Sequence, residues 1–430
     1  MKIVVCLLPV LCSALAAQDA GSWQKALNAG VDDCIAGRYR EAKTGLEALL
    51  AEAQWPDRDA RRLRAKEVLA VANRNLRDIQ AALAGHAEVL AKADAQTPEG
   101  KKLRLQALAN LAEIRVEQGE FRDAEALLTQ ALAVAHDIFG ETGPEVVTCL
   151  ENLASAEISE GKWETAVPLL QESVQFLRPA AAKNPKALLS DMGSLGSLYT
   201  RLGRYSQALP LLEEAVAEGT RTLPHDPALA DALMGLGTLY REQGNIARAE
   251  PLLQKAKAIY EQAGDMADMR GGAVLSDLGL LRLSERKYLE AEQYFRSSLA
   301  ILRTSYGADH FSAAVMEVNL AMACLRLGKD READELLRHS YPIEEDVYGA
   351  SWSMALWLQV RAQWEAKQGH LSEADARFRQ AIAMMEKVAG EDHPATAGLL
   401  AMYADFLKPR HKKEAATLKR QAAAIFALRK

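Results

Sequence analysis

The chain lacks the residues on which disulfide-stabilised and redox proteins depend. It has five cysteines in 430 residues, and two of them, Cys6 and Cys12, lie in an apolar segment at the N-terminus. The other three, Cys34, Cys149 and Cys324, are too widely spaced for a Cys-x-x-Cys motif. We expect these three thiols to be buried side chains rather than disulfide partners.

The sequence also lacks the motifs of common catalytic sites. It contains no glycine-rich phosphate loop, no nucleophile elbow and no His-Glu-x-x-His metal motif. We therefore predict a protein that is not an enzyme, with no catalytic residue, no metal site and no cofactor.

Long apolar runs are lacking after the N-terminus. Residues 3–15 are apolar except for Pro9 and Ser13, and they lead into small residues that a signal peptidase reads. The run is too short to span a membrane, which takes about 20 apolar residues. We expect residues 1–17 to be a signal peptide, and the mature chain to be exported, periplasmic or secreted, without stable membrane insertion. The alternative is a buried N-terminal helix.

An excess of positive charge is lacking as well. The chain has 52 basic and 58 acidic side chains and a formal net charge of −6. This balance argues against nucleic acid as a partner. Basic residues are concentrated only at 408–430, where eight Lys or Arg accompany a single Glu.

What the sequence does contain is one phrase that occurs ten times. In its clearest copies a Gly is followed two residues later by an aromatic residue and five residues later by Ala, as in Gly37-Arg-Tyr-Arg-Glu-Ala42. The phrase begins at residues 37, 78, 119, 161, 203, 244, 286, 328, 369 and 410, at intervals of 41 or 42 residues. A fixed period of this length is typical of an array of stacked supersecondary units.

The residues around the phrase indicate two helices in each unit. Seven residues before it lies a small residue, such as Ala112, Gly196 or Gly279, where two helices can approach closely. Ala occupies the fifth position after the start in nine of ten copies, with Leu83 as the exception. A large apolar residue such as Phe295 follows one helical turn later. Each unit is thus predicted to be a pair of antiparallel amphipathic helices.

Prolines mark where the first helix of several units begins. Four of them lie 16 to 18 residues before a phrase, at Pro144, Pro185, Pro227 and Pro394. The first position of a helix tolerates proline because its amide hydrogen would have no partner there. Asn184 and Asp226 directly precede two of these prolines and are predicted to be N-caps.

This pattern resembles the tetratricopeptide repeat, and its long period is similar to that of kinesin-light-chain repeats. The loops between units fit as well, since Ala389-Gly-Glu-Asp-His-Pro394 reads like the Gly-x-Asp-His-Pro turn of that family. The copy at 63–97 departs from the pattern because it lacks both the Gly and the Ala, and Arg286 and Arg410 replace the Gly elsewhere. The resemblance implies an all-α fold, a right-handed α-solenoid of antiparallel helix pairs.

We expect residues 18–430 to form one solenoid of about ten units, with a degenerate unit at 63–97 and a basic C-terminal capping helix at 408–430. The last repeat of such an array needs a polar outer face, and docking of this helix on an acidic partner or anionic lipid is the alternative. Three histidines, His225, His310 and His393, recur beside aspartates in loops between units. They lie about 20 Å apart by helix spacing, so we expect them to stabilise turns rather than share a metal ion.

A row of polar residues on the predicted first helices is the sequence feature that most strongly indicates a binding site. Its members stand two residues before the small residue of each unit and are Asn28, Asn110, Asn152, Ser194, Asp277 and Asn319. First helices line the concave wall of a right-handed helical-pair solenoid, and a side-chain amide offers a donor and an acceptor to an extended peptide. Nearby arginines are expected to add specificity, namely Arg201, Arg241 and Arg326. The alternative is that the amides bond neighbouring helices and order the stack.

Together these features predict a non-catalytic scaffold that binds a protein or an extended peptide along its concave face. The alternative is an exported sensory or enzyme-associated module whose effector is on another chain. Three of the six tryptophans, Trp352, Trp357 and Trp364, fall in one unit. We expect them to pack in the core, with an exposed interface patch as the alternative.

Overall fold

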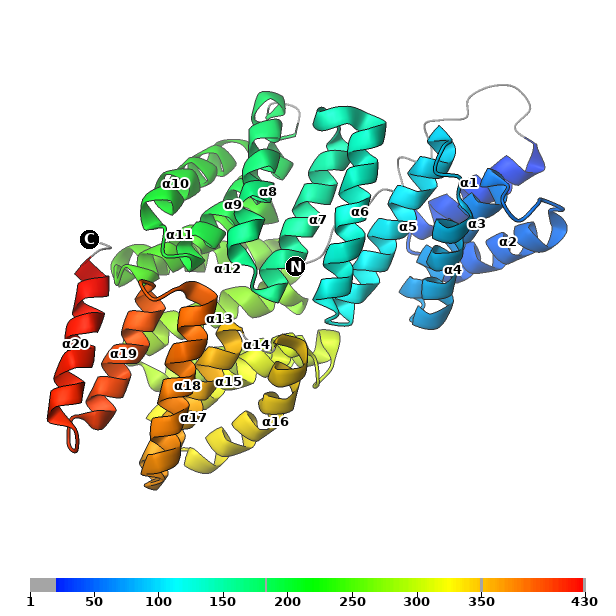
Figure 1. Cartoon of the computed structure of the whole chain (residues 1–430). Coiled ribbons are helices and arrows are strands. Elements are labelled where there is room, and N and C mark those ends of the chain that lie inside the picture. The colour runs from blue at the N-terminus through cyan, green and yellow to red at the C-terminus, as the bar shows by residue number, and fades with distance from the viewer. Residues whose placement is uncertain (1–20, 182–183, 349–350, 428–430) are drawn as a thin grey trace. The chain divides into compact units, whose positions relative to one another are not determined.

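The computed structural model describes residues 21–181, 184–348 and 351–427, and the regular structure within these residues is entirely helical (Figure 1). The predicted signal peptide, residues 1–17, lies outside the described residues. Contacts divide the chain into two compact units, one ending at Ser159 and one starting at Glu160, which we call the N-unit and the C-unit. No helix in these described ranges has both the length and the apolar character of a membrane span.

The helices of the N-unit follow one another with short turns between them. They are α1 (Ser22–Ile35), α2 (Tyr39–Glu52), α3 (Ala60–Asn75), α4 (Ile79–Lys92), α5 (Pro98–Glu117), α6 (Phe121–Phe139) and α7 (Pro144–Glu160). Helices α1, α3 and α5 each pack against the even-numbered helix that follows, α2, α4 and α6 respectively.

The C-unit continues the same alternation. Its helices are α8 (Trp163–Leu177), α9 (Pro185–Arg201), α10 (Tyr205–Thr222), α11 (Pro227–Glu242), α12 (Ile246–Ala263), α13 (Met269–Ser284), α14 (Tyr288–Tyr306), α15 (Phe311–Arg326), α16 (Asp330–Tyr348), α17 (Trp352–Gln368), α18 (Leu371–Ala389), α19 (Pro394–Leu407) and α20 (Lys412–Ala427). The prediction of an all-α solenoid of helix pairs is confirmed.

The Gly of the repeated phrase ends the first helix of a pair. Gly37, Gly244 and Gly369 have positive φ angles of 74°, 74° and 85°. The amide of the next residue then bonds the carbonyl five residues back, as from Arg38 to Asp33 at 2.7 Å. This is the Schellman arrangement, in which a left-handed residue satisfies the last carbonyls of a helix and glycine adopts that conformation without strain.

Two copies make the same turn without glycine. Arg77 and Arg286 have φ angles of 67° and 63°, and the next amides bond Asn73 and Arg282 at 2.9 Å. The second copy therefore starts at residue 77, one residue earlier than the sequence pattern placed it. This correction puts the fully buried Ala82 at the repeat Ala position instead of Leu83.

The corrected frame also places an unusual residue in the core. His86 takes the large apolar position of the second copy, where eight of the other nine copies have Leu or Phe, and it is 0% exposed. Its Nδ1 lies 2.8 Å from Oε1 of Glu67, which is buried as well. In the unit at 63–97, a buried polar pair thus stands where other units have an apolar contact.

Replacing Arg286 with glycine should raise the free energy of unfolding by roughly 1 kcal/mol. A left-handed backbone costs a residue with a Cβ about 1–2 kcal/mol, and the greater freedom of unfolded glycine offsets part of the gain. Gly328→Ala is the matched opposite change, since φ is 78° there and an added Cβ would meet no atom within 4 Å. Denaturant titration followed by circular dichroism should show a gain for the first variant and a loss for the second. Losses in both would contradict a left-handed Arg286.

The small residues of the pattern sit where the two helices of a pair cross. A Cβ added at Gly237 would lie 2.9 Å from Leu253, and one at Gly279 would lie 2.5 Å from Phe295. Both partner side chains are 0% exposed. The predicted role of the small residues in close helix approach is confirmed.

The helix starts agree with the proline pattern. Helices α7, α9, α11 and α19 begin at Pro144, Pro185, Pro227 and Pro394. Asn184 accepts from the amide of Ala187, and Asp226 from that of Ala228, so both predicted N-caps are confirmed. His310 and His393 also cap helices, through Nδ1, whereas the neighbouring Asp226 takes that role beside His225.

Cys34, Cys149, Cys324 and Trp357 are core residues, and Trp364 is partly buried against the core. Cys34, Cys149 and Cys324 are free and buried, as predicted. Trp357 is 5% exposed and donates from Nε1 to the carbonyl of Leu337 at 2.9 Å. Trp364 donates to the carbonyl of Asp330 at 2.9 Å. The third tryptophan of this cluster makes a different contact, which is described below.

Candidate partner-binding surface

In the N-unit the members of the polar row differ in burial and bonding. Asn28 on α1 is exposed and accepts from Gln24 Nε2 at 2.9 Å. Asn110 on α5 is 9% exposed, and its Nδ2 donates to Glu67 Oε1 on α3 at 2.7 Å. This bond joins two successive odd-numbered helices, which is what the stack-ordering interpretation predicts for Asn110.

Asn152 on α7 is more deeply buried. It is 3% exposed, and its Nδ2 has no hydrogen-bond acceptor among the described residues. A buried donor without a partner costs about 1–3 kcal/mol. The amide of Asn152 is therefore a group with unused bonding capacity.

In the C-unit the row continues on three odd-numbered helices. Ser194 on α9 is half-buried. Asp277 on α13 is also half-buried, and its Oδ2 accepts from Thr238 Oγ1 on α11 at 3.1 Å. Asn319 on α15 is 6% exposed, and its Oδ1 has no donor in the described part of the chain. Asn319 thus keeps a buried acceptor without a donor among the described residues.

The three arginines expected to add specificity differ in their contacts and exposure. Burial raises the pKa of Asp277, while the positive charges of Arg241 and Arg201 oppose that rise. Arg241 on α11 also donates to Glu242 at 2.8 Å. Arg201, at the end of α9, places its guanidinium 5.7 Å from the centre of the Trp163 ring. Arg326, at the end of α15, is exposed.

The structure therefore brings one member of the predicted row, Asp277, together with two of the predicted arginines. Arg201, Arg241, Thr238 and Asp277 form one electrostatic cluster on the successive helices α9, α11 and α13. Asn28, Asn110 and Asn152 belong to the N-unit.

The profile of the tetratricopeptide repeat matches residues 103–178, 187–262 and 272–346, and a second profile of the same description matches residues 355–395. These matches cover more than half of the sequence. The chain belongs to the tetratricopeptide repeat family. A search among curated proteins found no match.

Several solved structures are similar to this tetratricopeptide repeat protein. NprR in complex with its cognate peptide NprX is 14% identical, with a TM-score of 0.59 over 85% of this chain and 100% of that chain. Aspartyl phosphate phosphatase F from Bacillus subtilis is 12% identical, with a TM-score of 0.52 over 87% of this chain and 97% of that chain. A putative kinesin light chain from Podosopora anserina is 20% identical, with a TM-score of 0.28 over 58% and 98%. The TM-scores of NprR and of aspartyl phosphate phosphatase F show that they share the fold of this chain.

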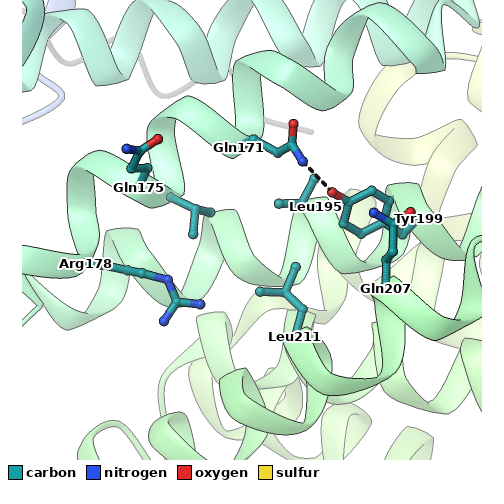
Figure 2. Close-up of a pocket in the computed structure, with 8 residues that line it drawn as sticks. Gln171, Gln175, Arg178, Leu195, Tyr199, Gln207 and Leu211 are labelled. Atoms are coloured by element: carbon teal, nitrogen blue, oxygen red, sulfur yellow. Dashed lines mark hydrogen bonds between the residues drawn. The ribbon is translucent and has the colours of Figure 1, made fainter.

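A shallow cleft on the tetratricopeptide repeat protein lies outside the polar row (Figure 2). It has a volume of about 380 Å³ and lies among α8, η3 (Arg178–Ala180), α9 and α10. Its lining residues are Gln171, Val174, Gln175, Arg178, Leu195, Tyr199, Gln207 and Leu211. Gln171 donates to the hydroxyl of Tyr199 at 2.8 Å, and Arg178 donates to Glu214 at 2.9 Å.

Sequence reasoning missed this cleft because each of its helices fits the repeat pattern separately. Gln171 and Gln175 are one helical turn apart on α8, which places both at one rim of the cleft. That spacing is the only sequence feature that points to the cleft, and the same spacing is common on solvent-exposed helix faces.

One group of side chains has the composition of a metal site. Glu292, Cys324 and Glu332 bring their ligand atoms within 4.8 Å of one another. However, Lys329 donates to both carboxylate oxygens of Glu292, at 2.6 and 2.7 Å, and Arg296 donates to both glutamates at 2.6 Å. The group therefore forms an ionic link from α14 to Lys329 and to Glu332 on α16.

The pKa values of this group fit that interpretation. Burial acts to raise the pKa of Glu292, but the hydrogen bonds from Lys329 and Arg296 outweigh burial and lower it. Burial raises the pKa of the Cys324 thiol to about 12. The carboxylate is thus charged and already paired, while the thiol stays protonated and is a poor metal ligand.

Proposed function

We propose that this tetratricopeptide repeat protein is a non-catalytic scaffold whose C-unit binds an extended peptide, or an extended segment of a protein, along its odd-numbered helices. The family and the fold support protein interaction as the general role. The peptide and the surface are the specific parts of the proposal, and the polar cluster on α9, α11 and α13 is the observation that carries them.

The packing of the helices favours the odd-numbered helices as the binding surface. Successive odd-numbered helices contact each other directly in the C-unit, as in α9–α11, α11–α13, α13–α15 and α15–α17. Direct contact brings these helices close together, so they lie on the inner side of the curve that the stack follows. Side chains on this inner side converge, which suits the binding of a narrow, extended ligand.

The spacing of the helices suits an extended chain. Packed helices lie about 8–10 Å apart, and an extended peptide advances about 3.3 Å per residue. Each odd-numbered helix would thus meet roughly every third residue of the ligand. Thr238, Asp277 and Asn319 stand on three successive odd-numbered helices and carry hydroxyl, carboxylate and amide groups, which are group types that can bond a peptide backbone.

The charges of the cluster favour a ligand with an acidic group. Arg201 and Arg241 contribute two guanidinium groups near Asp277, and Glu242 pairs with Arg241, which leaves the charge of Arg201 to attract such a group. Arg326 adds a third, exposed positive charge on α15. The fold relative NprR was solved with its cognate peptide, and its likeness to this chain supports a peptide as the ligand through fold alone.

A paired measurement of stability and binding tests the proposal. The double variant Asn319→Ala/Arg326→Ala should weaken partner binding by about 1–3 kcal/mol, since each lost hydrogen bond contributes about 0.5–1.5 kcal/mol. Its melting temperature should barely change, because Arg326 is exposed and Asn319 Oδ1 has no donor among the described residues. The partner is captured from an envelope extract on the immobilised full chain, and each variant is then titrated against it.

Two control variants make the result specific. Asn110→Ala should lower the free energy of unfolding by about 1–3 kcal/mol, because it removes a donor from the buried Glu67, and it should leave the affinity of folded molecules unchanged. Arg331→Ala on α16, a side chain that is 94% exposed, should change neither quantity. Equal affinities of the parent and the Asn319→Ala/Arg326→Ala variant would refute the proposed surface.

A further inference from the structure

Two segments of the C-unit that are far apart in sequence contact each other. The Nε2 of His393 donates to the carbonyl oxygen of Arg201 at 2.7 Å, across 192 residues. Arg201 is the last residue of α9, and His393 is the N-cap of α19. Nine α-helices, α10 to α18, lie between the two partners along the chain; Figure 1 shows the path of these helices.

Aromatic rings extend this contact. Trp163, the first residue of α8, and Trp352, the first residue of α17, have ring centroids 5.1 Å apart. Trp352 in turn meets the ring of His393 edge-on at 5.3 Å, and the guanidinium of Arg201 lies against Trp163. We call Trp163, Arg201, Trp352 and His393 the clasp.

The glycine beside the clasp shows how closely the two segments approach. A Cβ added at Gly203 would lie 3.0 Å from Pro394 Cδ and 3.5 Å from His393 Nε2. The equivalent glycines of other repeats have open surroundings, since a Cβ would meet no atom within 4 Å at Gly37, Gly161, Gly244, Gly328 or Gly369. Gly203 therefore serves the turn, like its counterparts, and in addition makes room for the start of α19.

The two ring nitrogens of His393 make two different hydrogen bonds. Its Nδ1 accepts from the amide of Ala395 at 3.1 Å, which caps α19, so the ring proton is on Nε2 and is donated to Arg201. His310 caps α15 in the same way, from the amide of Ser312 at 3.2 Å. Its ring stacks on Tyr306 within its own repeat, at 4.8 Å. Of these two capping histidines, His393 bonds a distant helix, whereas the ring of His310 contacts its own repeat.

We propose that the clasp is a conformational latch, which holds the C-unit in a closed turn and opens to widen the space between α8–α9 and α17–α19. Within the described residues, the hydrogen bond from His393 to Arg201 and the ring contact between Trp163 and Trp352 join the two sides, whereas neighbouring helices pack along much of their length. The clasp is therefore the joint that opens first when the stack flexes. Opening would change access to the odd-numbered helices without unfolding any repeat.

Distance measurements between spin labels test the latch in the full chain. Ser206→Cys and Lys387→Cys place labels at exposed positions on either side of the clasp. Cys34, Cys149 and Cys324 are buried, and burial raises the pKa values of Cys34 and Cys149 to about 11 and about 12, so these thiols react slowly with the label. Cys6 and Cys12, which lie outside the described residues, are replaced with serine in every variant. With the clasp intact, we expect one short and narrow distance distribution.

Two changes should open the latch. His393→Asn keeps an acceptor that can cap α19 but is too short to reach Arg201, and Trp352→Leu removes the aromatic contacts with Trp163 and His393. Each should shift the distances to longer values and broaden the distribution, while helix content by circular dichroism stays the same.

His310→Asn is the matched control, because it changes the same type of N-cap without touching the clasp, and its distance distribution should equal that of the parent. An unchanged distribution in His393→Asn would overturn the proposal. Equal broadening in His310→Asn would also overturn it, because the effect would then come from the loss of a histidine cap. No ligand enters the measurement, so its outcome is independent of the proposed peptide binding.

Discussion

Replacing Phe295 with alanine should lower the free energy of unfolding of the C-unit by about 3–5 kcal/mol. Phe295 on α14 is 0% exposed and fills the crossing with α13, where Gly279 leaves room for its ring. Truncation would remove the buried ring and leave a cavity that rigid neighbouring helices cannot close. The measurement is denaturant unfolding of the full chain, followed by circular dichroism. Phe426→Ala serves as the control, because that ring is 44% exposed and its loss should cost less than about 0.5 kcal/mol.

A compensating pair distinguishes crossing geometry from simple loss of apolar area. Gly279→Ala alone should cost about 1–3 kcal/mol, because its Cβ would lie 2.5 Å from the Phe295 ring. Other repeats combine Ala with Leu at these two positions, as at Ala321 and Leu337, and both are fully buried. Gly279→Ala combined with Phe295→Leu should therefore cost less than the sum of the two single changes. Strict additivity would contradict direct contact between the two positions.

Replacing Glu344 with glutamine should stabilise the protein above neutral pH. Glu344 on α16 is 0% exposed, its Oε1 has no partner among the described residues, and Ser353 donates to its other oxygen. Burial raises the pKa of Glu344 to about 7, against the opposing effect of the Ser353 hydrogen bond. Glutamine keeps the shape of the side chain without a charge that must be buried.

The sign of the pH dependence follows from these pKa values. Between the ordinary pKa of 4.5 and about 7, the unfolded chain has lost the proton while the folded chain keeps it. Stability therefore falls as pH rises through this window, by up to about 3 kcal/mol at roughly 1.4 kcal/mol per pH unit. Glu344→Gln should remove this loss, so the variant and the parent should differ most at pH 8 and little at pH 4. Glu335→Gln, on the exposed side of α16, should leave the pH profile unchanged.

The repeat architecture could be predicted from the sequence because its signals are local. A left-handed turn selects glycine, and a close helix crossing selects a small residue, so both leave a mark at a fixed position in every unit. The pattern failed by one residue at the second copy because Arg77 makes that turn in place of glycine. An arginine in a left-handed conformation has no signature that distinguishes it from an arginine in a helix.

The hydrogen bonds of the polar row could not be predicted, because they depend on partners that are far away in the sequence. Asn110 and Asn319 occupy equivalent positions, yet Asn110 bonds Glu67 while Asn319 keeps a free acceptor among the described residues. The difference arises 43 residues away from Asn110, on a helix that the pattern treats as equivalent to the others. The contact between Arg201 and His393 is more distant still, and it needs the accumulated twist of the intervening repeats.

The contact between α9 and α19 also changes how the C-unit can lose its structure. An array with contacts only between neighbours behaves as a one-dimensional chain, which can fray from its free end one repeat at a time. A bond across 192 residues links such a chain into a ring. Fraying from α20 must then break that ring before it can pass α19, so the repeats inside it gain a shared cooperativity. On refolding the ring closes last and at little entropic cost, because the repeats between its ends are already ordered.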